Sequence, residues 1–221
     1  MPSPSSPLRL RALASVSGLL ALLGACDAGG AVDSGEPCTP PFLVATDIDE
    51  TLTTSDSEWL EQIVDPTHDP QMRPDANTLM NAYADLGYRV LYVTARGEDM
   101  TLADGRSSRE ASWDWLVAHD FPGAEDDLFL AEGIGAAGDA AVAYKSAVLV
   151  NLHDQGWTTS WAYGNAESDI EAFLAAGVDA DRVFLTGELA GTMGVQPITD
   201  DEAYTSHLGS QMPGVDEVAC P

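Results

Sequence analysis

Short apolar segments alternate along this chain with longer helical segments, and no other feature constrains the fold as strongly. The pattern predicts buried strands over residues 42–46, 89–93, 128–130, 159–163 and 182–186. Helices are predicted between them, from Asp75 to about Leu86, from Ser107 or Ser108 onward, over Asp139–Asp154, and up to about Gly177. Strand–helix alternation with right-handed crossovers gives a mostly parallel sheet with helices on both faces. We therefore predict an α/β, three-layer Rossmann-like domain over residues 41–190.

Polar side chains follow these strands at the points where ligands bind to such sheets. They are, in chain order, Asp47, Asp49 and Thr51; Thr94, Ala95 and Arg96; Lys145; and Asn165 with Asp169. Two aspartates directly after an apolar strand are unfavourable without a partner such as a metal ion. In parallel sheets ligands bind at the carboxyl ends of the strands, so we expect these side chains to share one site. The set supplies carboxylates, a hydroxyl and a fixed positive charge, which suits phosphoryl transfer.

The same residues resemble the four motifs of the haloacid dehalogenase (HAD) superfamily. Asp47-x-Asp49-x-Thr51 resembles the first motif, Thr94 the second, Lys145 the third, and Gly164-Asn165-x-x-x-Asp169 the fourth. Residues 87–96 and 99–101, and residues 162–169 followed by Arg182-Val183-Phe184, resemble the lipin-type phosphatidate phosphatase domain. That domain also closes phosphatidylinositol-transfer proteins, where it can bind phosphatidate without catalysis. The resemblance implies a HAD fold, and residues 53–74 are too short for a large cap domain.

The resemblance also implies a role for each residue. Asp47 would attack phosphorus to form an aspartyl-phosphate, and Asp49 would act as general acid and then general base. Mg²⁺ would be the cofactor, held by Asp47, Asp49, Asn165 and Asp169. Phosphate would be bound by Thr51, Thr94, Ala95, Arg96 and Lys145. Both motif-one aspartates are present, which favours an active Mg²⁺-dependent phosphomonoesterase, with phosphatidate as a candidate substrate.

Several alternatives stay open on the residues alone. Asp47 and Asp49 could form a turn, Lys145 could be a solvated helix lysine, and Arg96 could pair with a surface acid. Asn165 could merely cap the following helix. At the level of function, the rivals are a non-catalytic phosphatidate- or phosphoinositide-binding module and a periplasmic acid phosphatase for small soluble esters.

The N-terminal 25 residues have the character of a targeting segment. Arg9 and Arg11 precede an apolar run from Ala12 to Ala25, which suits a signal peptide. Leu23-Gly24-Ala25-Cys26 resembles a bacterial lipobox, in which Cys26 would be lipidated. We therefore predict a signal peptide over residues 1–25, a flexible Gly- and Pro-containing tether over 26–40, and a membrane-anchored bacterial lipoprotein in the cell envelope. The alternative is simple secretion with Cys26 as a free thiol.

Two further features concern the ends of the domain and its surface. If Cys26 carries lipid, Cys38 and Cys220 remain as a possible disulfide pair, with the tail of residues 191–221 packing back on the domain. The chain has 9 Lys and Arg residues against 36 Asp and Glu residues, a net charge of −27. Because such a surface repels phosphate backbones, we predict no nucleic-acid partner. The expected partners are a phosphomonoester and, through the anchor, a membrane, and we expect a monomer.

Overall fold

The computed structural model describes residues 41–198 and 203–218 of the 221-residue chain. The predicted lipidation site Cys26, the predicted Cys38–Cys220 disulfide and the segments 1–25 and 26–40 lie outside these residues. None of the helices in the described ranges combines the length and the apolar character that crossing a membrane requires.

Within the described residues, six parallel strands form the central sheet, in the order β3-β2-β1-β4-β5-β6. The strands are β1 (Phe42–Thr46), β2 (Arg89–Gly97), β3 (Leu128–Ala131), β4 (Thr158–Gly164), β5 (Val183–Leu185) and β6 (Gln196–Pro197). The helices are α1 (Ser57–Val64), α2 (Ala76–Asp85), α3 (Ser108–Ala118), α4 (Asp139–Asp154), α5 (Glu167–Ala175) and α6 (Thr205–Gln211). The predicted α/β class and parallel sheet are therefore confirmed.

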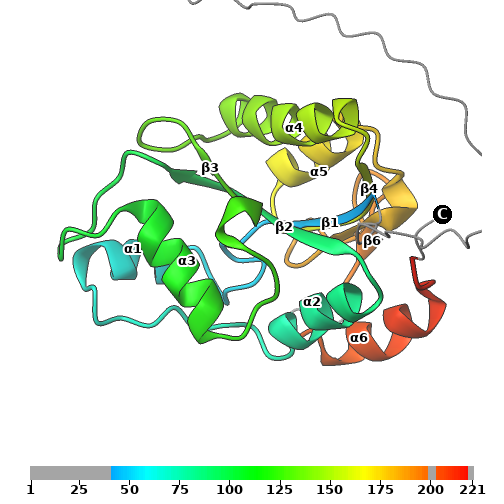
Figure 1. Ribbon diagram of the computed structural model, residues 1–221, viewed down its shortest axis with the longest axis horizontal. Helices are drawn as coiled ribbons and strands as arrows, with labels where there is room; N and C mark the ends of the chain where they lie inside the picture. Colours follow the sequence, from blue (N-terminus) through cyan, green and yellow to red (C-terminus); the bar gives the residue numbers. More distant parts are fainter. Residues whose placement is uncertain (1–40, 199–202, 219–221) are drawn as a thin grey trace, which may run out of the picture. The chain divides into compact units, whose positions relative to one another are not determined.

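The sheet separates two hydrophobic cores, because successive side chains of a strand point to opposite faces. Helices α4 and α5 cover one face, where Leu43 and Ala45 of β1 pack with Leu149 and Phe173. Helices α2 and α6 lie on the other face, where Val44 belongs to a cluster rich in aromatic rings. Figure 1 shows these layers, with α4 and α5 above the sheet and α2 and α6 below it.

One local expectation needs correction, and one helix was not expected. Asp75 precedes α2 as predicted, but it has φ 63° and makes no capping hydrogen bond; its carboxylate instead accepts a hydrogen bond from Thr205. Helix α1, in the segment between β1 and α2, was not predicted. By contrast, Ser107 caps α3 with a complete capping box, in which Glu110 is the reciprocal partner.

The segment after residue 202 packs against the aromatic core. Tyr204 is fully buried, and His207 of α6 accepts or donates a hydrogen bond at 3.0 Å with the hydroxyl of Tyr163. Farther along, the Val218 amide donates to the Leu86 carbonyl at 2.9 Å. The C-terminal segment 203–218 is thus part of the domain.

Candidate active site

The loop after β1 carries the first two site residues at the carboxyl edge of the sheet. The Asp47 amide still donates to the Tyr163 carbonyl of β4 at 3.0 Å, so Asp47 continues the strand geometry. Ile48 points into the aromatic core and is fully buried. Asp47 and Asp49, on either side of Ile48, therefore both line a pocket of about 640 Å³ at this edge.

Three residues outside the predicted set hold this loop in place. Glu50 has a left-handed backbone conformation (φ 54°), and its carbonyl oxygen accepts hydrogen bonds from Arg73 at 3.0 and 3.1 Å and from Thr186 at 3.2 Å. The Tyr204 hydroxyl donates to the Thr51 carbonyl at 3.0 Å. Only the rarity of basic residues in this chain could have pointed to Arg73 from the sequence.

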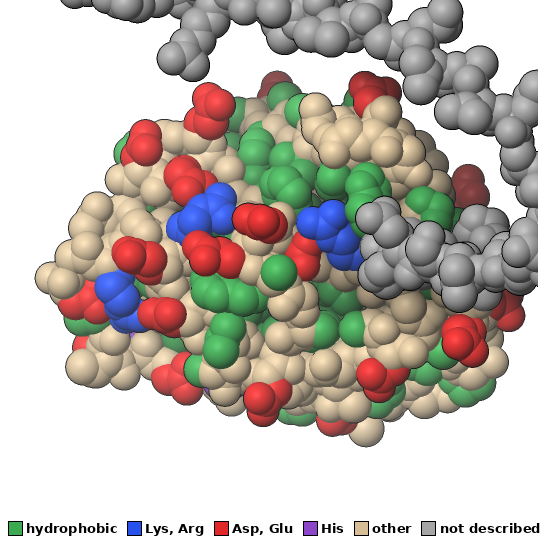
Figure 2. All heavy atoms as spheres, in the orientation of Figure 1, with side chains coloured by type: hydrophobic (Ala, Val, Ile, Leu, Met, Phe, Trp, Pro, Cys, Tyr) green, Lys and Arg blue, Asp and Glu red, His purple; other side chains and the backbone are tan. Residues whose placement is uncertain are grey.

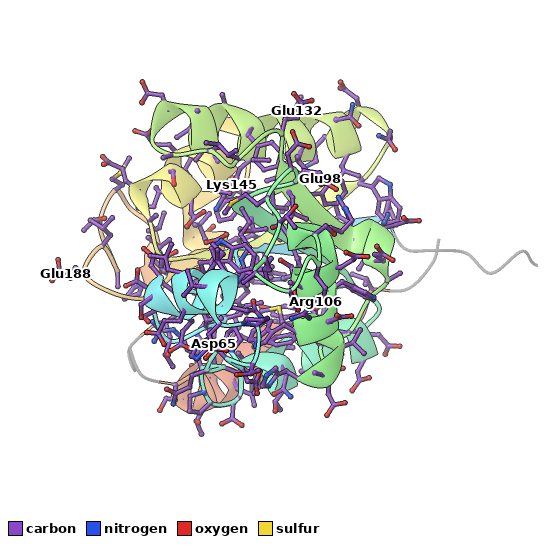
Figure 3. The ribbon with its side chains drawn as sticks, turned by 90° about the vertical axis from the view of Figure 1, so that its left-hand side faces the viewer. Asp65, Glu98, Arg106, Glu132, Lys145 and Glu188 are labelled. Atoms are coloured by element: carbon purple, nitrogen blue, oxygen red, sulfur yellow. The ribbon has the colours of Figure 1, made fainter. Side chains whose placement is uncertain are left out.

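Lys145 lies between two carboxylates at the floor of the pocket. Its Nζ is 2.9 Å from Asp47 Oδ1 and 2.6 Å from Asp169 Oδ1, and Lys145 is 2% exposed. Figure 3 looks onto this edge and shows Lys145 inside the molecule, with Glu132 and Glu188 farther out. The sequence-based alternative of a solvated lysine is excluded.

Burial and neighbouring charges together determine the pKa values of Asp47 and Lys145. Burial raises the pKa of Asp47 to about 7, because Lys145 offsets only part of the desolvation and Asp169 and Asp49 add repulsion. Burial alone would lower the pKa of Lys145, but Asp169 and Asp47 outweigh it and keep that pKa above its usual range. Lys145 is therefore a permanent positive charge at the pocket floor.

Both carboxylate oxygens of Asp169 are engaged in contacts that hold the structure together. Its Oδ2 accepts hydrogen bonds from the backbone amides of Asn165 and Ala166, both at 3.0 Å, and its Oδ1 is paired with Lys145. Gly164 allows this arrangement, since a Cβ there would lie 2.5 Å from the Asp169 Cβ. Asp169 is fully buried and orders the start of α5.

Arg96 contacts Asp49. Its Nε and Nη2 donate to the two Asp49 carboxylate oxygens at 2.9 and 2.7 Å, and its Nη1 donates to Ser112 at 2.8 Å. The Trp59 ring of α1 covers the guanidinium, with Cζ 4.1 Å from the ring centroid. Neither Ser112 nor Trp59 was predicted as a site residue. The predicted phosphate contact of Arg96 would require a change in this pairing.

The remaining predicted residues lie at the same edge. Thr94 is fully buried and donates weakly to Asp49 at 3.4 Å. Thr51 donates to the Asn165 side-chain oxygen at 3.1 Å, while the Asn165 amide nitrogen donates to Glu50 at 3.1 Å. Ala95 lines the pocket. All nine predicted site residues thus converge on one edge of the sheet.

The expected magnesium ligands are only partly available. Among the described residues, no group of three or more His, Cys, Asp and Glu side chains has the arrangement of a metal site. In this structure Arg96 engages Asp49, while Lys145 and two backbone amides engage Asp169. Asp47 is ion-paired with Lys145, and the Asn165 side-chain oxygen accepts a hydrogen bond from Thr51. Asp47 and Asn165 carry the oxygen atoms that would hold a divalent cation in this pocket.

Comparison with known proteins shows that most of the described chain resembles one domain family. Residues 44–187 match the model of the PITM 1-3 LNS2 domain. Human membrane-associated phosphatidylinositol transfer protein 3 is 29% identical over 143 residues, which cover 64% of this chain and 13% of that protein. The Drosophila melanogaster protein retinal degeneration B is 27% identical over 141 residues, 63% of this chain and 10% of its own. The chain thus matches only a small part of these longer relatives.

Solved structures agree on the fold. A HAD-like phosphatase of Mesorhizobium loti superposes with a TM-score of 0.54 at 20% identity, over 81% of this chain and 88% of its own. A D,D-heptose bisphosphate phosphatase of B. bronchiseptica, solved with magnesium and phosphate, gives a TM-score of 0.51 at 14% identity, over 76% and 97% of the two chains.

The relatives also overturn one prediction. They are animal proteins, namely membrane-associated phosphatidylinositol transfer protein 3 of human and mouse and the fruit-fly protein retinal degeneration B, so the predicted location as a bacterial cell-envelope lipoprotein is wrong. The family match spans well over half of the 221 residues. The chain therefore belongs to the PITM-type LNS2 domain family, which is built on the HAD-like fold.

Proposed function

We propose that this protein hydrolyses phosphomonoesters through Asp47, and that phosphatidate is a substrate. The observation that carries the proposal is the pairing of Asp47 with Lys145 at the floor of an open pocket, with Asp49 beside it. A carboxylate nucleophile, a fixed cation and a second carboxylate are the groups that a phosphoryl transfer through a covalent intermediate needs.

The chemistry takes two balanced steps. In the first, an Asp47 carboxylate oxygen attacks phosphorus, the phosphorus–ester oxygen bond breaks, and the leaving alkoxide takes a proton from the Asp49 carboxyl group. In the second, Asp49 removes a proton from water, the water oxygen attacks phosphorus, and inorganic phosphate leaves Asp47. Since Arg96 occupies both Asp49 oxygens, one of those hydrogen bonds must open for each proton transfer.

The surrounding residues would stabilise the charge on the transferring group. Lys145 offers its ammonium group at the pocket floor, and the Thr94 hydroxyl lies beside Asp49. A magnesium ion bound by Asp47 and Asn165 would neutralise phosphate charge and favour the ionised, nucleophilic form of Asp47. Loop 47–54 keeps Asp47 and Asp49 oriented through the contacts of Arg73 and Thr186 with the Glu50 carbonyl.

A binding module without turnover is the second candidate function. The human relative is a membrane-associated phosphatidylinositol transfer protein, and in this structure Arg96 holds Asp49 through two hydrogen bonds. If that pairing never opens, the pocket could hold a phosphate group without protonating a leaving group. The two candidates therefore differ in phosphate release and agree in phosphate binding.

Phosphate release by the purified full-length protein tests the proposal. Phosphatidate in mixed micelles and glycerol phosphate would each be assayed with Mg²⁺ and with a chelator. We expect Mg²⁺-dependent release from phosphatidate. Asp47→Asn should lower it by at least about 10³-fold, because the amide cannot replace the nucleophilic carboxylate.

Asp85→Asn is the matched control, since Asp85 is an exposed carboxylate at the end of α2. It should retain wild-type turnover. Turnover that survives in Asp47→Asn would exclude Asp47 as the nucleophile. Phosphatidate binding by the wild type without phosphate release would favour the binding module.

A further inference from the structure

Two exposed apolar side chains stand at the mouth of the pocket. Leu60 of α1 is 62% exposed and Ile134, in the loop between β3 and α4, is 83% exposed. Both line the same pocket as Asp47 and Lys145. We call Leu60 and Ile134 the apolar rim.

The backbone on each side of the rim is firmly held. A Cβ at Gly97 would lie 2.1 Å from the Ile134 carbonyl carbon, and the Ala136 amide donates to the Ala95 carbonyl at 3.0 Å. Helix α1 is fixed by Trp59, which covers Arg96. The rim side chains therefore cannot withdraw into the core without displacing segments attached to the end of β2.

The pocket wall suits an ester whose body is uncharged. Within the described residues, the only Lys or Arg side chains that line it are Arg96 and Lys145, and each is ion-paired with carboxylates. A second phosphate group would find no unpaired cation there. Much of the remaining wall is apolar, with Ile63, Met100 and Ala141 among its residues. Hydrocarbon, in contrast to a sugar, needs no hydrogen-bonding partners.

We propose that Leu60 and Ile134 are specificity-determining residues that contact the hydrocarbon of a membrane-borne phosphomonoester and the lipid surface around it. This inference rests on the proposed function and adds to it how the substrate is selected. Burial of the exposed parts of these side chains in hydrocarbon is favourable in proportion to their apolar area.

Charge indicates which lipid surface the rim fits. The chain carries a net charge of −27, and the carboxylates of Asp56 and Glu132 lie close to Leu60 and Ile134 in sequence. Figure 2 shows acidic side chains scattered over one face of the molecule, and Figure 3 shows others around the site. A bilayer rich in anionic lipid would be repelled, so the rim fits a mainly zwitterionic bilayer that carries the substrate and that the rim contacts through apolar atoms.

The test compares two double variants of the full-length protein. Leu60→Ser/Ile134→Ser removes the rim. Val117→Ser/Val150→Ser removes two apolar side chains that are 53% and 43% exposed on α3 and α4, away from the pocket. Phosphate release would be measured on phosphatidate in phosphatidylcholine vesicles and on glycerol phosphate, both with Mg²⁺, and vesicle binding would be measured by co-sedimentation.

We expect the rim variant to lower the ratio of lipid to soluble-ester turnover by at least about tenfold. The control pair should keep the ratio within about twofold. Adding phosphatidylglycerol to the vesicles should not strengthen binding of the wild type. Equal ratios for the two double variants, or binding that rises with phosphatidylglycerol, would overturn the proposal.

These measurements distinguish a failure of the rim proposal from a failure of the proposed hydrolase activity. If the wild type hydrolyses glycerol phosphate but neither binds nor hydrolyses vesicle phosphatidate, the rim proposal is wrong and the hydrolase stands. If the wild type releases phosphate from neither substrate, the proposed hydrolase activity is wrong. Co-sedimentation with vesicles then tests whether the rim contacts lipid. A tenfold loss of vesicle binding in the rim variant then supports it, and unchanged or absent binding refutes it.

Discussion

At the scale of single residues, three basic side chains hold the carboxylates and the loop at the carboxyl edge of the sheet. Lys145 forms ion pairs with Asp47 and Asp169, Arg96 forms one with Asp49, and Arg73 holds the carbonyl of Glu50. Buried carboxylates without such partners would be strongly unfavourable. Lys145 and Arg96 are therefore the cations that allow Asp47, Asp49 and Asp169 to lie close together.

Gly164 is a residue whose replacement should disturb this cluster indirectly. A methyl group in Gly164→Ala would lie 2.5 Å from Asp169 Cβ, so Asp169 must move away from Lys145 and from the start of α5. We expect a loss of about 1–3 kcal/mol in the free energy of unfolding, typical of overpacking. Urea unfolding measures the stability, and phosphate release should fall with it.

Gly209→Ala is the control for this change. Gly209 lies within α6, and a Cβ there would have no heavy atom within 4 Å. Alanine should leave the free energy of unfolding unchanged or raise it by up to about 1 kcal/mol. Equal stability of the two variants would show that the close approach of Gly164 and Asp169 is unimportant.

At the scale of elements, the sequence predicts what depends on local pattern. The strands β1 to β5 follow from apolar runs, and the Ser107 cap of α3 follows from side chains three residues apart. Helices α1 and α6 were not predicted, although α1 is strongly amphipathic; both are short, with eight and seven residues. Trp59 of α1 packs with Leu102 and Ala111, and His207 of α6 contacts Tyr163, which are all distant in sequence. Tertiary packing therefore helps to stabilise these two short helices.

The candidate site likewise has one part that the sequence predicts and another that depends on the folded structure. The order of motifs along the strands predicts that Asp47, Thr94, Lys145 and Asn165 meet at one edge, since parallel strands end together. The sequence does not predict the partner of each charge. That Arg96 binds Asp49 depends on side-chain conformations and on the Trp59 ring above it, which belong to the folded protein alone.

At the scale of the whole molecule, the C-terminal segment connects the aromatic core to the site. Tyr83 and His207 both contact the Tyr163 hydroxyl, at 2.7 and 3.0 Å. Tyr204, beside them, donates to the Thr51 carbonyl in the active-site loop. Residues from opposite ends of the domain thus support the loop that carries Asp47.

This packing predicts a pH dependence of stability. Burial lowers the pKa of His207 to about 4, below its unfolded value of 6.5. Its stabilising contribution is therefore fully present above pH 6.5 and is lost as the pH falls toward 4, by up to about 3 kcal/mol. Asp47 acts in the opposite direction, because its pKa is raised in the folded state.

Comparison with His207→Gln isolates the histidine. Urea unfolding of both proteins at several pH values between 7.5 and 4.5 gives their difference in stability, from which the contribution of Asp47 cancels. We expect the difference in the free energy of unfolding between the wild type and the variant to shrink as the pH falls. Parallel curves would show that His207 is protonated equally well in the folded and unfolded states.

The most direct measurement of the central claim is the detection of a phosphoryl group on Asp47. The Asp49→Asn variant would be mixed with para-nitrophenyl phosphate and Mg²⁺, then acid-quenched and analysed by peptide mass spectrometry. The nitrophenolate leaving group needs no proton donor, so Asp47 should still be phosphorylated, whereas the missing base slows hydrolysis. The account predicts one phosphoryl group on the peptide that contains Asp47. Turnover by the wild type with no covalent phosphate in the variant, or with phosphate on another residue, would contradict it.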